Sequence, residues 1–205
     1  DGFELQSYTS STDTNVIFSY DADWGNTDSH FPYVYDYFSE TLRDRKSFNQ
    51  EFRAVSDSAD FQKNSFFEWV IGANYLELKE SNLKKDDGLY GDPSDPYGPY
   101  ASASASSSKY KSSNFSVFGN LDYLLSASLK FSIGLRWEDW EADYSDSLQE
   151  SFNPTDKMSG GKISLIKNMT NNTNMYASLA RGYKQGGFNL GLGLDVNSRN
   201  KNLAY

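Results

Sequence analysis

The chain has 205 residues and a formal net charge of −9, so it lacks the basic surface that a nucleic-acid-binding protein uses. It contains no cysteine, which excludes disulfide frameworks, thiolate metal sites and cysteine nucleophiles. Only 38% of the residues are hydrophobic, and the longest apolar run has three residues, whereas a membrane-spanning helix needs about 18. Helical membrane spans are therefore excluded, but a β-barrel is not, because only every second residue of its wall must be apolar.

The first quarter of the chain predicts extended segments of mixed polarity. Residues 3–12 and 15–24 predict a pair of strands joined by a tight polar turn at Thr12-Asp13-Thr14. A loop is expected over 25–32, followed by one long strand or two over 35–56, where the middle is polar and the apolar face is only loosely kept.

The next segments predict two strands on either side of a long loop. After a turn at 57–64, residues 66–80 alternate between an apolar and a polar face. Residues 81–113 break this alternation with KKDDGLYGDPSDPYGPY and the low-complexity ASASASSSKYKSS, which predicts a long extracellular loop. Alternation resumes over 115–123.

Alternation is strictest in SLKFSIGLRWEDW, residues 128–140. Its apolar face spans nine residues, close to the roughly 9 to 11 that a tilted strand needs to cross a bilayer. The side chains expected to face lipid are Leu129, Phe131, Ile133, Leu135 and Trp137. Those expected to face an aqueous lumen are Lys130, Arg136 and Glu138.

The last third predicts a polar loop at 141–155, a strand at 157–168, a compact turn at 169–174 and a strand at 175–188. The remaining residues predict a loop and the start of a further strand. Altogether the chain predicts an all-β, antiparallel sheet of about eight strands, in which short turns alternate with long loops. That arrangement is typical of outer-membrane barrels.

Four passages resemble the barrel of the TonB-dependent outer-membrane receptors, in the order in which that family has them. They are SETLRDRKSFNQEFRAVS (39–56), FFEWVIGANYLEL (66–78), FSVFGNLDYLLSASLKFSIGLRWEDWEADY (115–144) and MYASLARGYKQGGFN (175–189). The resemblance implies a 22-stranded transmembrane β-barrel plugged by an amino-terminal domain. Residues 1–205 are then expected to be an internal part of that barrel, without the plug.

The resemblance also implies a function and a location. Receptors of this family import a scarce, bulky nutrient, such as a ferric siderophore, a vitamin-like cofactor or an oligosaccharide, across the outer membrane of Gram-negative bacteria. The expected partners are outer-membrane lipid, the nutrient, and the TonB complex acting through the plug. Neither catalysis nor a protein-bound cofactor is implied.

Tyrosines and aspartates within the expected long loop are candidates for binding the nutrient, because tyrosine rings stack on sugars and on aromatic iron chelators. The candidates are Tyr90, Tyr97, Tyr100, Asp92 and Asp95. The alternative for the same side chains is that they pack the loop or lie near lipid headgroups.

Enzyme and metal sites are not indicated. His30, the single histidine, lies in an expected loop, and the chain has no G-x-S-x-G motif for a serine nucleophile. The aspartates near residue 90 do not have the spacing of an EF-hand. Two other interpretations of the β-strand pattern remain: a self-contained eight-stranded outer-membrane barrel, and a secreted soluble β-sandwich that binds carbohydrate.

Overall fold

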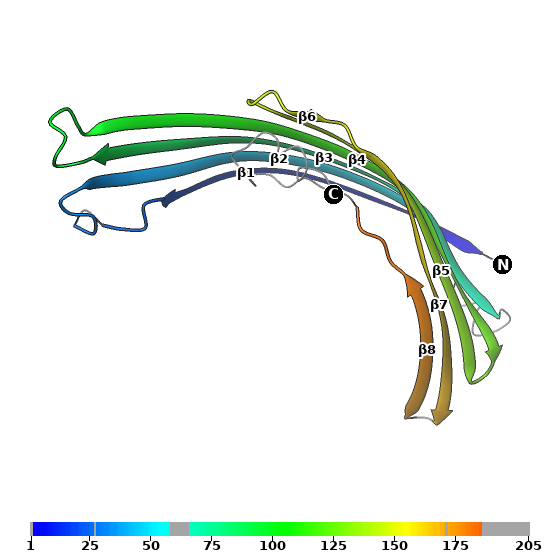
Figure 1. Ribbon diagram of the computed structural model, residues 1–205. Coiled ribbons are helices and arrows are strands. Elements are labelled where there is room, and N and C mark those ends of the chain that lie inside the picture. Colours follow the sequence, from blue (N-terminus) through cyan, green and yellow to red (C-terminus); the bar gives the residue numbers. More distant parts are fainter. Residues whose placement is uncertain (1, 27, 58–65, 171, 186–205) are drawn as a thin grey trace.

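The computed structural model describes residues 2–26, 28–57, 66–170 and 172–185. Eight β-strands form one sheet, and none of the described residues forms a helix that could cross a membrane (Figure 1). The strands are β1 (Phe3–Asp21), β2 (Val34–Ser56), β3 (Phe67–Gly91), β4 (Tyr100–Ser126), β5 (Leu129–Asp146), β6 (Ser151–Phe152), β7 (Thr155–Thr170) and β8 (Thr173–Arg181).

The sheet follows the order of the chain. Its strands run β1-β2-β3-β4-β5-β7-β8, with the short β6 paired to β5, and every pair is antiparallel. The predicted all-β, antiparallel class with about eight strands is therefore confirmed. Within the described residues β1 and β8 are not paired and no second sheet covers the first, so neither a small closed barrel nor a β-sandwich is formed.

The predicted turn at Thr12-Asp13-Thr14 is wrong, because β1 continues straight through it. Asp13 lies opposite Lys46 of β2, and its carboxylate is 3.1 Å from the Lys46 ammonium group. Thr12 and Thr14 are β-branched residues, which favour a pleated strand. The 35–56 segment is one strand and not two. The turn expected at 57–64 lies outside the described residues, apart from Asp57.

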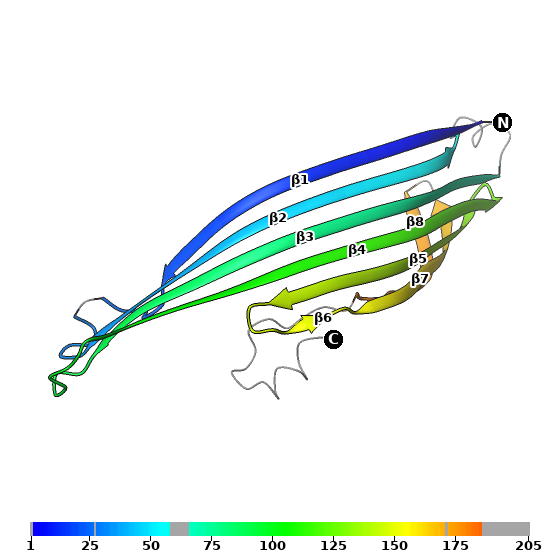
Figure 2. The same ribbon diagram turned by 90° about the horizontal axis from the view of Figure 1, so that it is seen from above.

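The long loop predicted over 81–113 is also wrong. β3 and β4 remain paired from Phe67↔Tyr123 to Tyr90↔Tyr100, so that only residues 92–99 connect them. Figure 2 shows this hairpin reaching far beyond the end of β5. The sequence did not reveal these strand extensions because Ser and Ala alternate in this part of β4 and charged residues occupy the paired part of β3. Neither segment therefore has an apolar face that a periodic pattern could identify.

The 141–155 segment is only partly a loop. β5 extends to Asp146, β6 occupies Ser151–Phe152 and β7 starts at Thr155. The strand predicted at 157–168 is confirmed as the central part of β7. The turn expected at 169–174 is tighter, since Thr170 already pairs with Thr173. β8 ends at Arg181, and the rest of the sequence from 186 onward lies outside the described residues.

The register divides the sheet into two faces of different chemistry. One row of directly paired residues contains only apolar side chains: Trp69, Leu121, Ile133, Ile163 and Leu179. Of the two neighbouring rows, one contains Phe67, Tyr123, Phe131, Leu165 and Ala177, and the other contains Ile71, Gly119, Leu135, Gly161 and, at the β8 end, Arg181. Apart from Arg181 these rows are free of charge, and the apolar surface extends along β3 from Phe67 to Tyr75. We call this surface the belt face; nine residues of strand correspond to roughly 30 Å.

The opposite face contains the most buried side chains. Trp140, Ala142 and Met158 are at most 5% exposed, and Tyr110 and Tyr183 pack against them. The Trp140 indole N–H has no hydrogen-bond partner among the described residues. Packing between large side chains is thus concentrated where β4, β5 and β7 adjoin, beyond the level of the belt.

Candidate functional site

A row of tyrosines crosses three strands close to the residue 92–99 connection. Tyr35 lies opposite Tyr90, and Tyr90 lies opposite Tyr100. Directly opposed residues have Cβ atoms about 4.5–5.5 Å apart, so the three side chains are neighbours. By alternation they lie on the face opposite the belt, and each is between 42% and 52% exposed. The structure therefore brings the predicted residues Tyr90 and Tyr100 together.

Two further aromatic residues extend this row and were missed in the sequence. The ring centroid of Tyr37 is 4.7 Å from that of Tyr35, and the His30 ring packs edge-on against Tyr35 at 5.0 Å. Tyr37 lies over Gly88, where a Cβ atom would come within 2.2 Å of the tyrosine ring. The signal was present as Tyr33-x-Tyr35-x-Tyr37, because alternate residues of a strand share a face.

The other residues predicted to bind the nutrient, Tyr97, Asp92 and Asp95, do not lie in the tyrosine row. Tyr97 is 85% exposed at the end of the hairpin. Asp92 accepts hydrogen bonds from the backbone N–H (2.8 Å) and the hydroxyl (2.7 Å) of Ser94. Asp95 accepts from the Tyr97 N–H at 2.9 Å and from the Tyr100 hydroxyl at 2.8 Å. These two carboxylates shape the connection, and Asp95 also orients Tyr100 beside Tyr90.

Hydrogen bonds shift the pKa values of these groups. The Ser94 backbone N–H, followed by its hydroxyl, lowers the pKa of Asp92 below its ordinary value near 3.8. The hydrogen bond to Asp95 raises the pKa of the Tyr100 hydroxyl. The Gly25 N–H similarly lowers the pKa of Asp23 in the β1–β2 connection. Asp92 and Asp23 are therefore charged, and Tyr100 neutral, throughout the physiological range.

The Asp92 shift predicts how the hairpin end responds to acid. A carboxylate with a lowered folded pKa contributes stability above the unfolded pKa and loses it as pH falls through the folded value. The backbone amides of residues 92–99 should stay protected from hydrogen exchange from neutral pH to about pH 5, and they should lose this protection below about pH 3.8. Hydrogen exchange followed by mass spectrometry, corrected for intrinsic rates, measures this. In the Asp92→Ala variant, residues 92–99 should exchange without protection at every pH. If these residues are as protected in the variant as in the native chain, the role of Asp92 is contradicted.

The alternating segment of β5 has its two kinds of side chain on opposite faces. The residues expected to face lipid lie on the belt face: Leu129, Phe131, Ile133, Leu135 and Trp137. On the other face, Lys130 Nζ is 3.0 Å from an Asp122 carboxylate oxygen and Arg136 is 2.5 Å from Glu138. Cations on this face are thus matched by carboxylates within the sheet.

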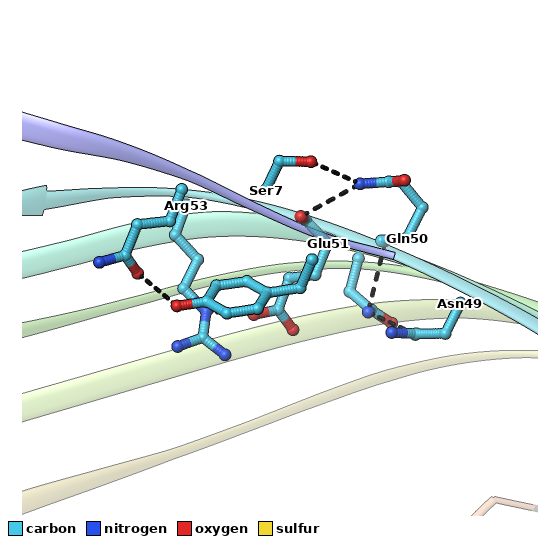
Figure 3. A network of polar contacts seen from close by, with 8 residues as sticks. Ser7, Asn49, Gln50, Glu51 and Arg53 are labelled. Atoms are coloured by element: carbon cyan, nitrogen blue, oxygen red, sulfur yellow. Dashed lines mark hydrogen bonds and ion pairs between the residues drawn. The ribbon is translucent and has the colours of Figure 1, made fainter. Parts of the chain in front are cut away.

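A polar network continues that face across β1 to β3. The Arg53 guanidinium is paired with Glu51 and lies 4.7 Å above the ring of Tyr8. Asn74 donates to the Asn49 side-chain oxygen at 2.7 Å. Figure 3 shows the Arg53 guanidinium and Asn49 on this side of the ribbon, whereas Ser7 and Gln50 lie on the other side, which is the belt face. The chemistry therefore suits an aqueous surface with many hydrogen-bonding groups.

The single histidine and the acidic residues do not gather into a metal-binding cluster in the described part of the chain. His30 packs in the β1–β2 connection against Tyr35, and its Nε2 atom has no hydrogen-bond partner among the described residues. No three His, Asp or Glu residues in the described ranges are grouped so that they could hold a metal ion. What the arrangement offers is a set of aromatic rings and hydroxyl groups at the end of the β3–β4 hairpin.

Comparison with known proteins identifies the sheet. The siderophore receptor PiuA from Acinetobacter baumannii aligns with a TM-score of 0.62 and 14% identity over 97% of this chain and 32% of its own. The ferric yersiniabactin uptake receptor FyuA from Yersinia pestis aligns with a TM-score of 0.51 and 16% identity over 90% of this chain and 29% of its own. The ferric citrate transporter FecA aligns with a TM-score of 0.52 and 15% identity over 91% of this chain and 24% of its own. The chain thus spans about a quarter to a third of these receptors, whose similarity shows the fold.

Sequence comparison gives the same result at the level of the family. No curated protein sequence matches the chain. The family described as TonB dependent receptor-like, beta-barrel matches residues 1–204, which is almost the whole chain. The chain therefore belongs to the TonB-dependent receptor-like β-barrel family.

Proposed function

We propose that this chain forms part of the wall of an outer-membrane receptor that binds a scarce, bulky nutrient and imports it with energy from the TonB system. The observation that carries the proposal is the apolar belt, whose height matches a bilayer and whose strands become polar beyond it. In this proposal the belt face contacts lipid in the outer membrane of a Gram-negative bacterium, and the opposite face lines an aqueous lumen.

The composition of the two faces supports this orientation. An outer-membrane barrel presents an apolar band about 25 Å tall to lipid, flanked by aromatic residues. The belt extends for roughly 30 Å of strand, which tilting reduces in height. Phe67 and Tyr123 lie opposite each other at one edge of the belt, and Tyr75 and Phe115 lie opposite each other at the other edge.

The tyrosine row is the proposed part of the nutrient site, and the 81–113 segment, which carries Tyr90 and Tyr100, is proposed to lie outside the cell. Aromatic rings at the end of a well-paired hairpin can stack on a planar chelator or on a sugar ring. The aligned receptors are described as taking up ferric yersiniabactin, ferric citrate or a siderophore, which supports an iron chelate as the class of nutrient. No covalent step is required of the chain.

Single tyrosine substitutions test the site. Tyr90→Ala should weaken binding of the accepted nutrient by about 1–2 kcal/mol, which is roughly five- to thirtyfold, because a stacked ring is lost. Tyr97→Ala is the matched control and should have little effect, since Tyr97 lies apart from the row. The measurement is binding of ferric catecholate, ferric hydroxamate, ferric citrate, cobalamin and maltodextrin to cells producing each variant, with growth on the same compounds. Equal losses for Tyr90 and Tyr97 would rule out the tyrosine row.

A further inference from the structure

We propose that the tyrosine row selects its ligand by charge, and that it binds a positively charged iron chelate in preference to a negatively charged one. The chemical class is a hydroxamate chelate with a free amine. Three hydroxamates neutralise ferric iron, so the ammonium group gives such a chelate one positive charge, whereas catecholate and citrate chelates of ferric iron are negatively charged. This inference rests on the proposed function and adds to it the sign of the charge that the site accepts.

The end of the sheet that carries the tyrosine row has a large excess of negative charge. Residues 16–42 and 86–108 contain nine carboxylates and no lysine or arginine. The carboxylates are Asp21, Asp23, Asp28, Asp36, Glu40, Asp86, Asp87, Asp92 and Asp95. Since the formal net charge of the whole chain is −9, these two stretches account for all of it, and the rest of the chain is balanced.

Two of the nine carboxylates are neutralised within the sheet. Asp86 lies 3.0 Å from the Lys84 ammonium group, and Glu40 lies 3.6 Å from that of Lys85. The other seven form no ion pair with a lysine or arginine in the part of the chain that the structure describes. The negative charge at this end is therefore an excess that neighbouring side chains do not compensate.

Asp23 and Asp95 place this charge at the two ends of the tyrosine row. The Asp95 carboxylate accepts a hydrogen bond from the Tyr100 hydroxyl at 2.8 Å. The Asp23 carboxylate accepts hydrogen bonds from the backbone N–H groups of Tyr37, at 3.1 Å, and Gly25, at 2.7 Å. These N–H and O–H donors are neutral groups, so both carboxylates keep their negative charge beside the rings.

Basic side chains on the same face lie far from the row. On β3, Lys84 precedes Tyr90 by six residues, which is roughly 20 Å of strand. On β2, Arg43 follows Tyr35 by eight residues, which is roughly 26 Å, and it donates to the Asn82 side-chain oxygen at 2.8 Å. A negatively charged chelate at the tyrosine row would therefore meet carboxylates without a cation to offset their repulsion.

The tyrosine rings also favour a cation. The negative face of an aromatic ring attracts an ammonium group that lies within about 6 Å of the ring centroid. Tyr35 has Tyr37 at 4.7 Å between centroids and Tyr90 directly opposite, so an ammonium group can contact more than one ring. The hydrogen bond from Tyr100 to Asp95 makes that ring richer in electrons, which strengthens its attraction for a cation. Rings alone stack on chelates of either charge, whereas rings flanked by carboxylates favour the positive one.

The test compares three chelates that differ in charge, using the protein at its full natural length in detergent micelles. Ferrioxamine B carries one positive charge, its N-acetyl derivative is neutral, and its N-succinyl derivative carries one negative charge. Titration calorimetry should give affinities that fall in this order, by about fivefold for each unit of charge, which is the effect of one charge pair about 4 Å apart in water. The differences should shrink when the ionic strength rises from about 0.1 M to about 1 M, because the Debye length falls from about 10 Å to about 3 Å.

A double variant tests the two carboxylates that flank the row. Asp23→Asn/Asp95→Asn keeps the hydrogen-bond acceptors and removes both charges, so the ratio of the affinities for the positive and the negative chelate should fall by about fivefold or more. Asp44→Asn/Asp139→Asn, with the same charge change on the belt face, should leave this ratio unchanged. Partial unfolding of a variant lowers the number of binding sites but not the ratio of affinities, so the ratio reports the effect of charge.

Equal affinities for the three chelates, binding of none of them, or an equal change of the ratio in the two double variants would overturn the charge selection. Tyr90→Ala separates this inference from the proposed function. If the three chelates bind equally and Tyr90→Ala weakens all of them, the charge selection is wrong and the tyrosine row stands. If Tyr90→Ala weakens none of them relative to Tyr97→Ala, both proposals are overturned.

Discussion

Replacing Ile133 by arginine is expected to prevent assembly of the protein into the outer membrane, whereas arginine at the adjacent Ser132 should be tolerated. Ile133 lies in the middle of the belt face, between Leu121 on β4 and Ile163 on β7. An arginine at the lipid midplane of a barrel costs about 2–4 kcal/mol. The measurement is the amount of heat-modifiable protein in outer-membrane fractions, separated by gel electrophoresis without boiling.

Ser132 is the matched control because it occupies the same strand at the same height but faces the other way. Its hydroxyl donates to an Asp122 carboxylate oxygen at 2.5 Å, and Lys130 already pairs with the same carboxylate. An arginine at position 132 would have Asp122 as a partner and water around it. If both variants assemble equally well, the belt face does not contact lipid and the proposed orientation fails.

Truncating Trp140 to alanine is expected to lower the free energy of unfolding by about 3–5 kcal/mol, the usual cost of removing a buried large aromatic side chain. Trp140 is 2% exposed and contacts Ala142 and Met158, so the loss leaves a cavity where β5 meets β7. The measurement is urea unfolding of protein refolded into liposomes, followed by far-ultraviolet circular dichroism.

Phenylalanine at position 140 separates packing from hydrogen bonding. The Trp140 indole N–H has no partner within the described residues, and a buried unpaired donor costs about 1–3 kcal/mol. Trp140→Phe removes that donor while it keeps most of the apolar volume, so the net loss should be about 1 kcal/mol or less. A loss as large as that of the alanine variant would mean that the indole N–H makes a stabilising interaction.

Alternation revealed the strands only where one face is apolar. The segment from Leu129 to Trp137 was recognisable because Phe131, Ile133 and Leu135 share the belt face with similar residues of β4 and β7. The distal halves of β3 and β4 have polar residues on both faces, and neither period nor propensity distinguishes Ala101 to Ser108 from a loop. The extended conformation of residues 101–108 is determined by hydrogen bonding to β3. The sequence of β4 alone does not specify this conformation.

The candidate site was also only partly predictable from the sequence. Tyr90 and Tyr100 were found because they stand close together in sequence, on the two sides of one connection. Tyr35 and Tyr37 lie more than fifty residues earlier and join them only through the pairing of β2 with β3. A site assembled across strands requires the register, which a periodic pattern does not supply.

The pairing of β3 with β4 up to Tyr90↔Tyr100 has a consequence for antibody recognition. Since residues 92–99 are fixed at the end of a continuous ladder and by the Asp92 and Asp95 turns, their shape depends on strands that a short peptide lacks. Antibodies raised against the folded protein should treat this tip as a conformational epitope. A linear peptide copied from it should compete weakly, and a stapled hairpin should compete well.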